Sequence, residues 1–316
     1  MNALHHQSLA SEPAQEHAES LPTILLALDG SKRSQAAIPV ARKLRDIYGA
    51  TLHVVYVGTH AFDRDVTAER LGFTVQESRE LIFESSRGKP SELIARLGLS
   101  YPGSIVVMST ETGEPTGGDH FGSVTESVFS LRPERIVLFS PNGTAESWGL
   151  RRILLAHDGT PASHAATGPA ADLAHRVGAE VIALHVAARG EGRTTKAGSI
   201  PAPRYLDQPQ HEWPNWAGEF MNRLLAGGTP SPHVHFKLAV TGGQPGSEVA
   251  HVARERKIDL VVMAWHGHWE SESSEPGSSF AAAVAPSCWC IHPIKLSRLS
   301  SRKESRNATW SSGNDF

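Results

Sequence analysis

Residues 23–57 read TILLALDGSKRSQAAIPVARKLRDIYGATLHVVYV, and residues 152–186 read RILLAHDGTPASHAATGPAADLAHRVGAEVIALHV. The two stretches align without a gap at an offset of 129 residues (152 − 23), and 14 of the 35 aligned pairs are identical. Further along, GKPSELIA at 88–95 corresponds to GQPGSEVA at 243–250, now at an offset of 155. The chain is therefore a tandem duplication, and its second copy carries 26 extra residues (155 − 129).

Each copy alternates strands with helices. The openings TILLALD and RILLAHD are continuous apolar runs, typical of strands that are covered on both faces. The helical spacing of Ala, Val and Leu that follows ends at Gly49 and Gly178, as expected of helix C-termini. A Gly-x-Pro turn then begins a further helix, followed by a buried strand, a loop, a helix at GSVTESVF or GSSFAAAV, and a last strand, RIVLFS or WCIHPI. This order predicts two tandem α/β domains, each a doubly wound parallel sheet.

The domain boundaries follow from composition. Disordered tails are predicted at 1–20 and 297–316, domains at 21–142 and 151–296, and a linker at 143–150. The insertion, at about 189–215, is rich in Gly and Pro and leads into a short predicted helix, AGEFMNRLLAGG. After it, HVHFKLAV alternates strictly, which predicts a half-exposed edge strand with His233 and His235 on its polar face.

The order of these pieces resembles the universal stress protein family: a strand that ends in Asp, a helix that closes on Gly-Ala, Gly-x-Pro, a strand that ends in VVM, and Gly-Ser before a helix. The likeness covers nearly the whole chain apart from the two tails and the insertion. It implies, in each domain, a nucleotide-alpha-hydrolase-like sheet of five parallel strands in the order 3-2-1-4-5, with ATP bound where strands 1 and 4 diverge. Open parallel sheets favour that position generally, because the winding reverses there. The resemblance also implies an intramolecular pseudo-dimer with the last strands of each sheet near the shared interface, and it leaves homodimerisation of the whole chain open.

The resemblance implies nucleotide contacts from the strand-1 carboxylate, a strand-2 residue that lines the base, and a phosphate loop Gly-x2-Gly-x9-Gly-Ser/Thr after strand 4. Small residues in such a loop let backbone N–H groups approach phosphate. In the second copy these positions carry over to Asp158, Val186, Met263, Ala264, Gly267, Gly277 and Ser278. In the first copy they carry over to Asp29, Val57, Gly122 and Ser123.

The second copy matches the phosphate-loop pattern more completely than the first. In the second copy only Ala264 replaces a glycine of the phosphate-loop pattern. The first copy has Ser109 and Thr112 at the first two glycine positions of that pattern. Both loops are acidic and contain no Lys or Arg, and their carboxylates are Glu111, Glu114 and Asp119 in one and Glu270, Glu272 and Glu275 in the other. These carboxylates repel a triphosphate unless a divalent cation such as Mg²⁺ intervenes. We therefore expect ATP with Mg, chiefly in the second domain.

Two functions remain open at this point. In the first, the protein binds or senses a nucleotide in a stress response. In the second, it is a protein-interaction scaffold with decayed sites, whose insertion presents Trp213 and Trp216 to a partner unless these close onto their own domain. Catalysis is not expected, because G-x-S-x-G, G-x-x-x-x-G-K-[ST] and H-E-x-x-H are all absent.

Net charge, the length of the apolar runs, and the cysteines and histidines bear on further classes of function. A net charge of −3 argues against nucleic-acid binding, and the apolar runs are too short for a membrane span. Cys288 and Cys290 stand two apart in a predicted strand, so we expect buried structural thiols and a cytoplasmic location; metal or redox use is the alternative. Four histidines, His157, His185, His266 and His268, fall near the carboxyl edge of the second sheet. Since relatives often carry histidine at two of these positions, we expect no metal.

Overall fold

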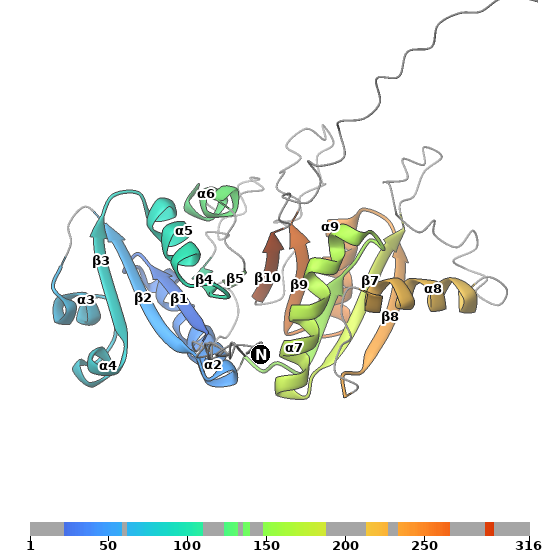
Figure 1. The fold of residues 1–316 in the computed structure, drawn as a ribbon, viewed down its shortest axis with the longest axis horizontal. Coiled ribbons are helices and arrows are strands. Elements are labelled where there is room, and N and C mark those ends of the chain that lie inside the picture. The colour runs from blue at the N-terminus through green and yellow to red at the C-terminus, as the bar shows by residue number, and fades with distance from the viewer. Residues whose placement is uncertain are drawn as a thin grey trace, which may run out of the picture.

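Two α/β halves lie side by side in the computed structural model (Figure 1). The structure describes residues 22–58, 62–109, 123–131, 135–139, 148–187, 213–226, 233–265 and 288–293. The first half contains β1 (Thr23–Leu28), α1 (Lys32–Gln35), α2 (Ile38–Tyr48), β2 (Thr51–Gly58), α3 (Arg64–Arg70), α4 (Val75–Glu80), β3 (Ile82–Arg87), α5 (Pro90–Ser100), β4 (Ile105–Ser109), α6 (Ser123–Leu131) and β5 (Ile136–Phe139). The second contains β6 (Arg152–Ala156), the 3-10 helix η2 (Pro161–Ala166), α7 (Thr167–Val177), β7 (Glu180–Ala187), α8 (Trp213–Ala226), β8 (Phe236–Gly242), α9 (Pro245–Glu255), β9 (Leu260–Trp265) and β10 (Cys288–Pro293).

Ten strands of the described residues form one sheet, in the order β3-β2-β1-β4-β5-β10-β9-β6-β7-β8. Within each half the neighbouring strands are parallel and follow the predicted order 3-2-1-4-5. β5 and β10 pair antiparallel and join the halves, with Val137 opposite Cys290. β8 lies at one outer edge, which confirms the edge strand predicted from HVHFKLAV, and His233 and His235 are exposed beside it.

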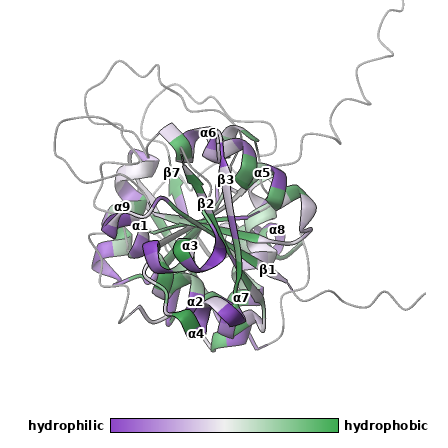
Figure 2. Cartoon of the chain, turned by 90° about the vertical axis from the view of Figure 1, so that its left-hand side faces the viewer, coloured by the Kyte–Doolittle hydropathy of each residue, from purple (hydrophilic) through white to green (hydrophobic). Residues whose placement is uncertain are grey.

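The apolar strands contribute to two layers of hydrophobic core, one on each face of the sheet. In β1, Ile24 and Leu26 pack on one face of the sheet while Leu25 packs on the other, and all three are buried. Helices α2, α7 and α8 cover the first face, and α5, α6 and α9 cover the second. Figure 2 shows apolar strands inside and mixed helices outside. A sheet covered on both faces explains why its strands read as unbroken apolar runs.

The helix boundaries follow local chemistry. α2 and α7 end at Gly49 and Gly178, whose φ of 59° and 65° are left-handed, as the predicted C-termini require. α5 and α9 begin with proline in the first turn, where no backbone donor is needed. α8 begins at Trp213, four residues before the start predicted at 217 (217 − 213), because the Trp-Pro pair enters its first turn. Among the helices of the described ranges, none has the length and apolar character to cross a membrane.

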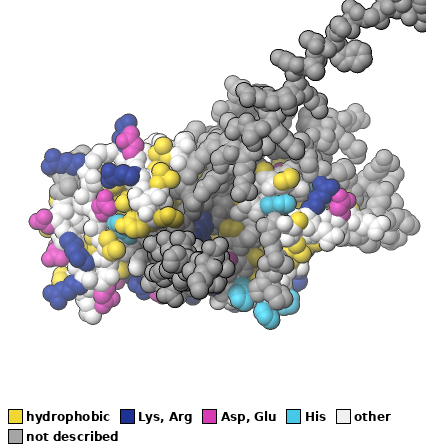
Figure 3. Space-filling model, viewed as in Figure 1, with side chains coloured by type: hydrophobic (Ala, Val, Ile, Leu, Met, Phe, Trp, Pro, Cys, Tyr) yellow, Lys and Arg dark blue, Asp and Glu magenta, His cyan; other side chains and the backbone are white. Residues whose placement is uncertain are grey.

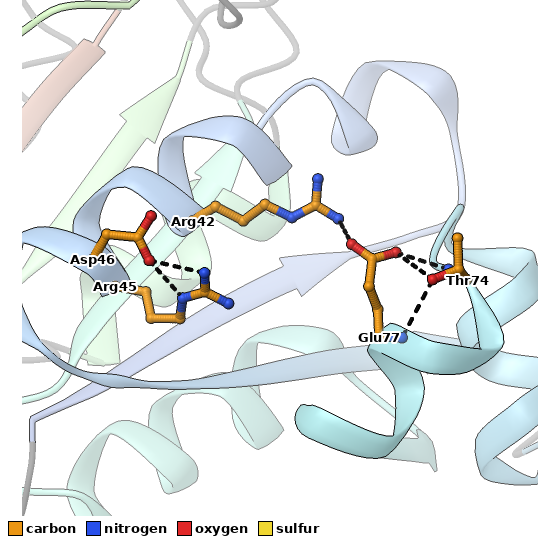
Figure 4. Close-up of polar contacts among 5 residues, drawn as sticks. All are labelled: Arg42, Arg45, Asp46, Thr74 and Glu77. Atoms are coloured by element: carbon orange, nitrogen blue, oxygen red, sulfur yellow. Dashed lines mark hydrogen bonds and ion pairs between the residues drawn. The ribbon is translucent and has the colours of Figure 1, made fainter.

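Polar contacts fix α4 against α2 (Figure 4). Thr74 caps α4 by accepting a hydrogen bond from the Glu77 N–H at 3.2 Å, and Glu77 accepts one from the Thr74 N–H at 2.9 Å. Glu77 also pairs with Arg42 of α2. The hydrogen bond from the Thr74 backbone is the main cause that lowers the pKa of Glu77. On the face in Figure 3, Lys and Arg side chains are interspersed with Asp and Glu over the first half.

Candidate functional site

A cleft of about 110 Å³ opens at the carboxyl ends of β1 and β4 in the first half. These strands are neighbours, and the chain leaves them toward opposite faces of the sheet, so the cleft lies at the point where the winding reverses. The residues that line it are Ala27, Leu28, Asp29, Ser31, Arg33, Ser34, Val55, Val57, Pro90, Ile94, Met108, Ser109, Val124 and Thr125. Six elements therefore contribute: β1, α1 with the turn that precedes it, β2, α5, β4 and α6.

The cleft has an apolar floor and polar neighbours. Val55, Ile94 and Met108 line it and are buried. The polar side chains that share the lining are Asp29, Ser31, Arg33, Ser34, Ser109 and Thr125. Val124 and Thr125 bring the first turn of α6 to the cleft, where backbone N–H groups have no partner within the helix. This combination suits a ligand with a flat apolar part and an anionic or hydroxyl-bearing part.

Asp29 follows β1 and organises the turn into α1. Its carboxylate accepts a hydrogen bond from the Ser31 N–H at 2.8 Å, and its own N–H donates to the Ser34 hydroxyl at 3.3 Å. Partial burial acts to raise the pKa of Asp29, but hydrogen bonds from Ser34 and Ser31 outweigh it and lower that pKa. Asp29 is therefore a carboxylate at neutral pH, exposed at the mouth of the cleft.

Asp158 holds the corresponding turn after β6 in the second half. Its Oδ1 accepts hydrogen bonds from the Thr160 N–H at 2.9 Å and the Thr160 hydroxyl at 2.6 Å. The Ser163 hydroxyl donates to the same oxygen at 2.5 Å. Thr160 and Ser163 are buried, so this carboxylate stabilises its own turn from within the fold.

His157 precedes Asp158 and is 3% exposed. Its ring stacks on His164 at 5.4 Å between centroids and meets the edge of Phe220 of α8 at 5.6 Å. The Gly159 N–H donates to Nδ1 at 3.0 Å, so the neutral ring carries its proton on Nε2, which has no hydrogen-bond partner among the described residues. Burial foremost, and then the neighbouring His164, lower the pKa of His157 to about 4, although Asp158 acts in the opposite sense.

His185 of β7 lies in the same cluster. Its Nδ1–H donates to the His157 carbonyl at 3.3 Å, and its ring packs at 5.3 Å from both Trp216 and Phe220. Burial lowers the pKa of His185, against the opposing effect of that hydrogen bond. These aromatic rings fill the space between α8 and the strands of the second half.

Comparisons with known proteins bear on both halves. Residues 149–290 match the model of the universal stress protein family. These residues therefore form a domain of the universal stress protein family. The fold agrees: a universal stress protein from Archaeoglobus fulgidus DSM 4304 superposes with a TM-score of 0.59 and 15% identity, over 88% of this chain and 98% of its own. A putative universal stress protein from Pseudomonas aeruginosa UCBPP-PA14 gives 0.58 and 13% over 87% and 94%. No curated protein sequence matches the chain.

The first half brings two predicted site residues together. Asp29 and Val57 both line the cleft. Ser123 begins α6 and is exposed, and the residues of that turn that reach the lining are Val124 and Thr125. Gly122 lies outside the described residues.

In the second half the described part of the site is incomplete. Asp158 and Val186 stand at the ends of β6 and β7, and Met263 and Ala264 near the end of β9, all at one edge of the sheet. Val186 and Met263 pack against the core face that corresponds to the floor of the first cleft. Gly267, Gly277 and Ser278 lie outside the described residues, as do His266 and His268.

Sequence reasoning missed several residues of the first cleft. Ser34 had a detectable signal, because Asp-Gly-Ser/Thr-x-x-Ser occurs in both copies, at 29–34 and 158–163. Arg33, Ile94 and Thr125 had none in the sequence, since they meet the cleft only through the packing of α1, α5 and α6.

The insertion's aromatic residues have a structural role. Trp216 is buried and stacks on Phe220 at 5.2 Å, so it closes α8 onto its own domain rather than facing a partner. The side chain of Trp213 lies outside the described residues. Within the described ranges, no group of three or more His, Cys, Asp or Glu side chains is arranged to hold a metal ion.

Proposed function

We propose that this chain binds ATP or a related nucleotide in a stress response, in the cleft of its first half, and does not turn it over. The cleft itself carries the proposal, because an apolar floor and convergent polar groups meet at the point where the winding of the sheet reverses. The sequence prediction favoured the second half; the described geometry supports the first.

The lining assigns a role to each part of a nucleotide. Val55, Val57 and Ile94 offer an apolar surface to a base. The ionised Asp29 at the mouth accepts hydrogen bonds from ribose hydroxyls. The first turn of α6 supplies backbone donors for phosphate oxygens. Mg²⁺ bound to the nucleotide would offset the negative charge of its phosphates.

Binding without turnover follows from the same lining. Its described ionisable groups are Asp29 and Arg33. The carboxylate of Asp29 already accepts a hydrogen bond from Ser31 and, with a lowered pKa, is a poor general base.

Native mass spectrometry on gently purified protein, followed by calorimetric titration with ATP-Mg, tests the proposal. The cleft-filling variant is Val57→Trp, and Val186→Trp is its matched control, because position 186 is the equivalent of 57 in the second copy (57 + 129). We expect Val57→Trp to weaken ATP binding by at least about tenfold, since the indole occupies space that the base needs, while Val186→Trp leaves it unchanged. Circular dichroism verifies that both variants fold.

The titration also decides between the competing assignments. Loss of binding in Val186→Trp alone would move the site to the second half. Wild-type protein that binds no ATP at millimolar concentration would favour the alternative function, a protein-interaction scaffold with decayed nucleotide sites.

A further inference from the structure

We propose that His175 and His233 together bind a divalent metal cation of the Cu²⁺, Ni²⁺ or Zn²⁺ class on the surface of the second half. Their rings are stacked with 6.1 Å between centroids and 20° between planes. His175 lies in the last turn of α7, and His233 shortly precedes β8. Figure 3 shows histidine side chains together at the lower edge of this half. The site is separate from the proposed nucleotide cleft, which lies in the first half.

The distance between the two rings suits a shared ion. A metal bonds an imidazole nitrogen at about 2.0–2.1 Å, so two rings that share one ion have centroids about 5–6.5 Å apart. The observed 6.1 Å lies in this range. Both side chains are exposed, so rotation about their own torsions can aim one nitrogen of each ring at the same ion. Within the described residues no third His, Cys, Asp or Glu side chain is arranged with them, so water fills the other coordination positions.

The backbone segments that carry the two rings are both held against β7. α7 ends at Gly178, just before β7 begins. The chain at the start of β8 is held by the Val181 N–H of β7, which donates to the His235 carbonyl at 3.0 Å. The two histidines are 58 residues apart in the sequence (233 − 175), but the fold brings them together before any ion arrives. Metal binding therefore has to order only side-chain torsions.

The charges beside the histidines are already paired. The Arg176 Nε–H donates to the Asp172 carboxylate at 2.9 Å, and the Arg176 guanidinium lies over the ring of Tyr48 in the first half. Lys237 of β8 pairs with Glu180 of β7. A cation at the two rings thus meets neutral imidazoles and balanced ion pairs. Imidazole nitrogen suits Cu²⁺, Ni²⁺ and Zn²⁺, whereas Mg²⁺ prefers oxygen ligands, so the site selects the first group.

The duplication shows that the fold does not require this pair. The position of His175 is taken in the first copy by Asp46, at the offset of 129. The position of His233 is taken by Ser78, at the offset of 155, and Ser78 is buried in α4. Both first-copy residues belong to a half with the same strand order. The two histidines are therefore a property of the second copy, and replacing them should leave its fold intact.

Nuclear magnetic resonance of the full chain locates the site among the other histidines. Paramagnetic Cu²⁺, added alone in substoichiometric amounts, should first broaden the backbone amide signals around His175 and His235. Diamagnetic Zn²⁺ should then shift the same signals and give the affinity of this site.

Three substitutions test whether one ion is shared. His175→Gln and His233→Gln should each weaken Zn²⁺ binding at this site by at least about tenfold, because the second ligand of a chelate binds intramolecularly. The double variant should bind no more weakly than either single variant, since each substitution already removes the chelate. His251→Gln is the matched control and should bind as the wild type does, because His251 is exposed on α9 and lies beside Glu255 rather than a second histidine. Circular dichroism verifies that every variant folds.

The contrary results are equally distinct. Cu²⁺ broadening that spares the signals around His175 and His235 would overturn the site. Losses that add up in the double variant would indicate two separate one-histidine contacts and overturn a shared ion. Mg²⁺ that shifts these signals as strongly as Zn²⁺ does would overturn the assigned class of metal. All of these experiments omit nucleotide, so their outcome leaves the proposed function of the first half untouched.

Discussion

The two copies differ most informatively at three single positions. Leu28, Gln35 and Tyr56 of the first half correspond, at the offset of 129, to His157, His164 and His185. Leu28 is 4% exposed and His157 3%, so a leucine and a histidine occupy equally buried places. The second half therefore has a titratable group in its core where the first half has none at that position. Its burial makes the imidazole resist protonation.

His157 makes stability depend on pH. Its pKa is about 4 in the folded protein, against 6.5 for an ordinary histidine. Between these values the unfolded chain binds the proton and the folded chain does not, so the free energy of unfolding falls as the pH falls through this window and is fully present above it. The difference between these two pKa values corresponds to a loss on the order of 3 kcal/mol in the free energy of unfolding. We predict that His157→Leu removes most of this loss, as measured by urea unfolding at about pH 7 and about pH 4.5.

The exposed His233 is the control for that prediction. His233→Gln should lose stability on acidification as the wild type does. Unfolding free energies that fall equally in His157→Leu and the wild type would show that other groups, such as His185, dominate the acid response.

At the scale of elements, the copies differ between their second and third strands, where the first has α3 and α4 and the second has α8. Phe220 and Leu224 are fully buried, and Trp216 is nearly so. They attach the helix to the sheet through His157 and His185 rather than through ion pairs, since the Arg223–Glu219 pair is exposed.

Phe220→Ala tests that attachment. The substitution removes the ring that contacts His157, His185 and Trp216, and leaves a cavity. We expect a loss of about 3–5 kcal/mol in the free energy of unfolding, measured in urea, with faster amide exchange across α8. Glu219→Ala breaks an exposed pair on the same helix and should cost less than about 1 kcal/mol. Comparable losses in the two variants would contradict a helix held by its buried face.

The elements that local chemistry determines were predictable from the sequence. Gly49 and Gly178 marked helix ends, and the alternation around Phe236 marked an edge strand. The start of α8 was misplaced, because Trp213 and Pro214 carry a loop signal that a first helical turn also accepts. Asp29 and Val57 entered the site through family resemblance. Arg33 did not, because its place in the cleft depends on how α1 faces β4 and α6, which no spacing in the sequence encodes.

The two halves are joined in three ways. β5 and β10 pair antiparallel, which makes one continuous sheet of the two five-stranded units. On each face of that sheet an apolar cluster includes residues of both halves. Arg176 of α7 also lies over the ring of Tyr48 of α2, 4.8 Å from its centroid. We therefore expect the halves to unfold together.

Trp148 packs where the two halves meet. It is buried beside Leu44 of α2, Leu173 of α7 and Leu260 of β9, and its indole N–H donates to the Asp259 carbonyl at 2.9 Å. Trp148→Ala should cost about 3–5 kcal/mol and split one calorimetric transition into two, because the apolar contact between the halves is lost. Trp148→Phe keeps that contact and removes only the hydrogen bond, so it should cost about 1 kcal/mol and preserve the single transition. A single transition in Trp148→Ala would instead assign the coupling to the β5–β10 pairing and the Arg176–Tyr48 contact, since the substitution leaves both intact.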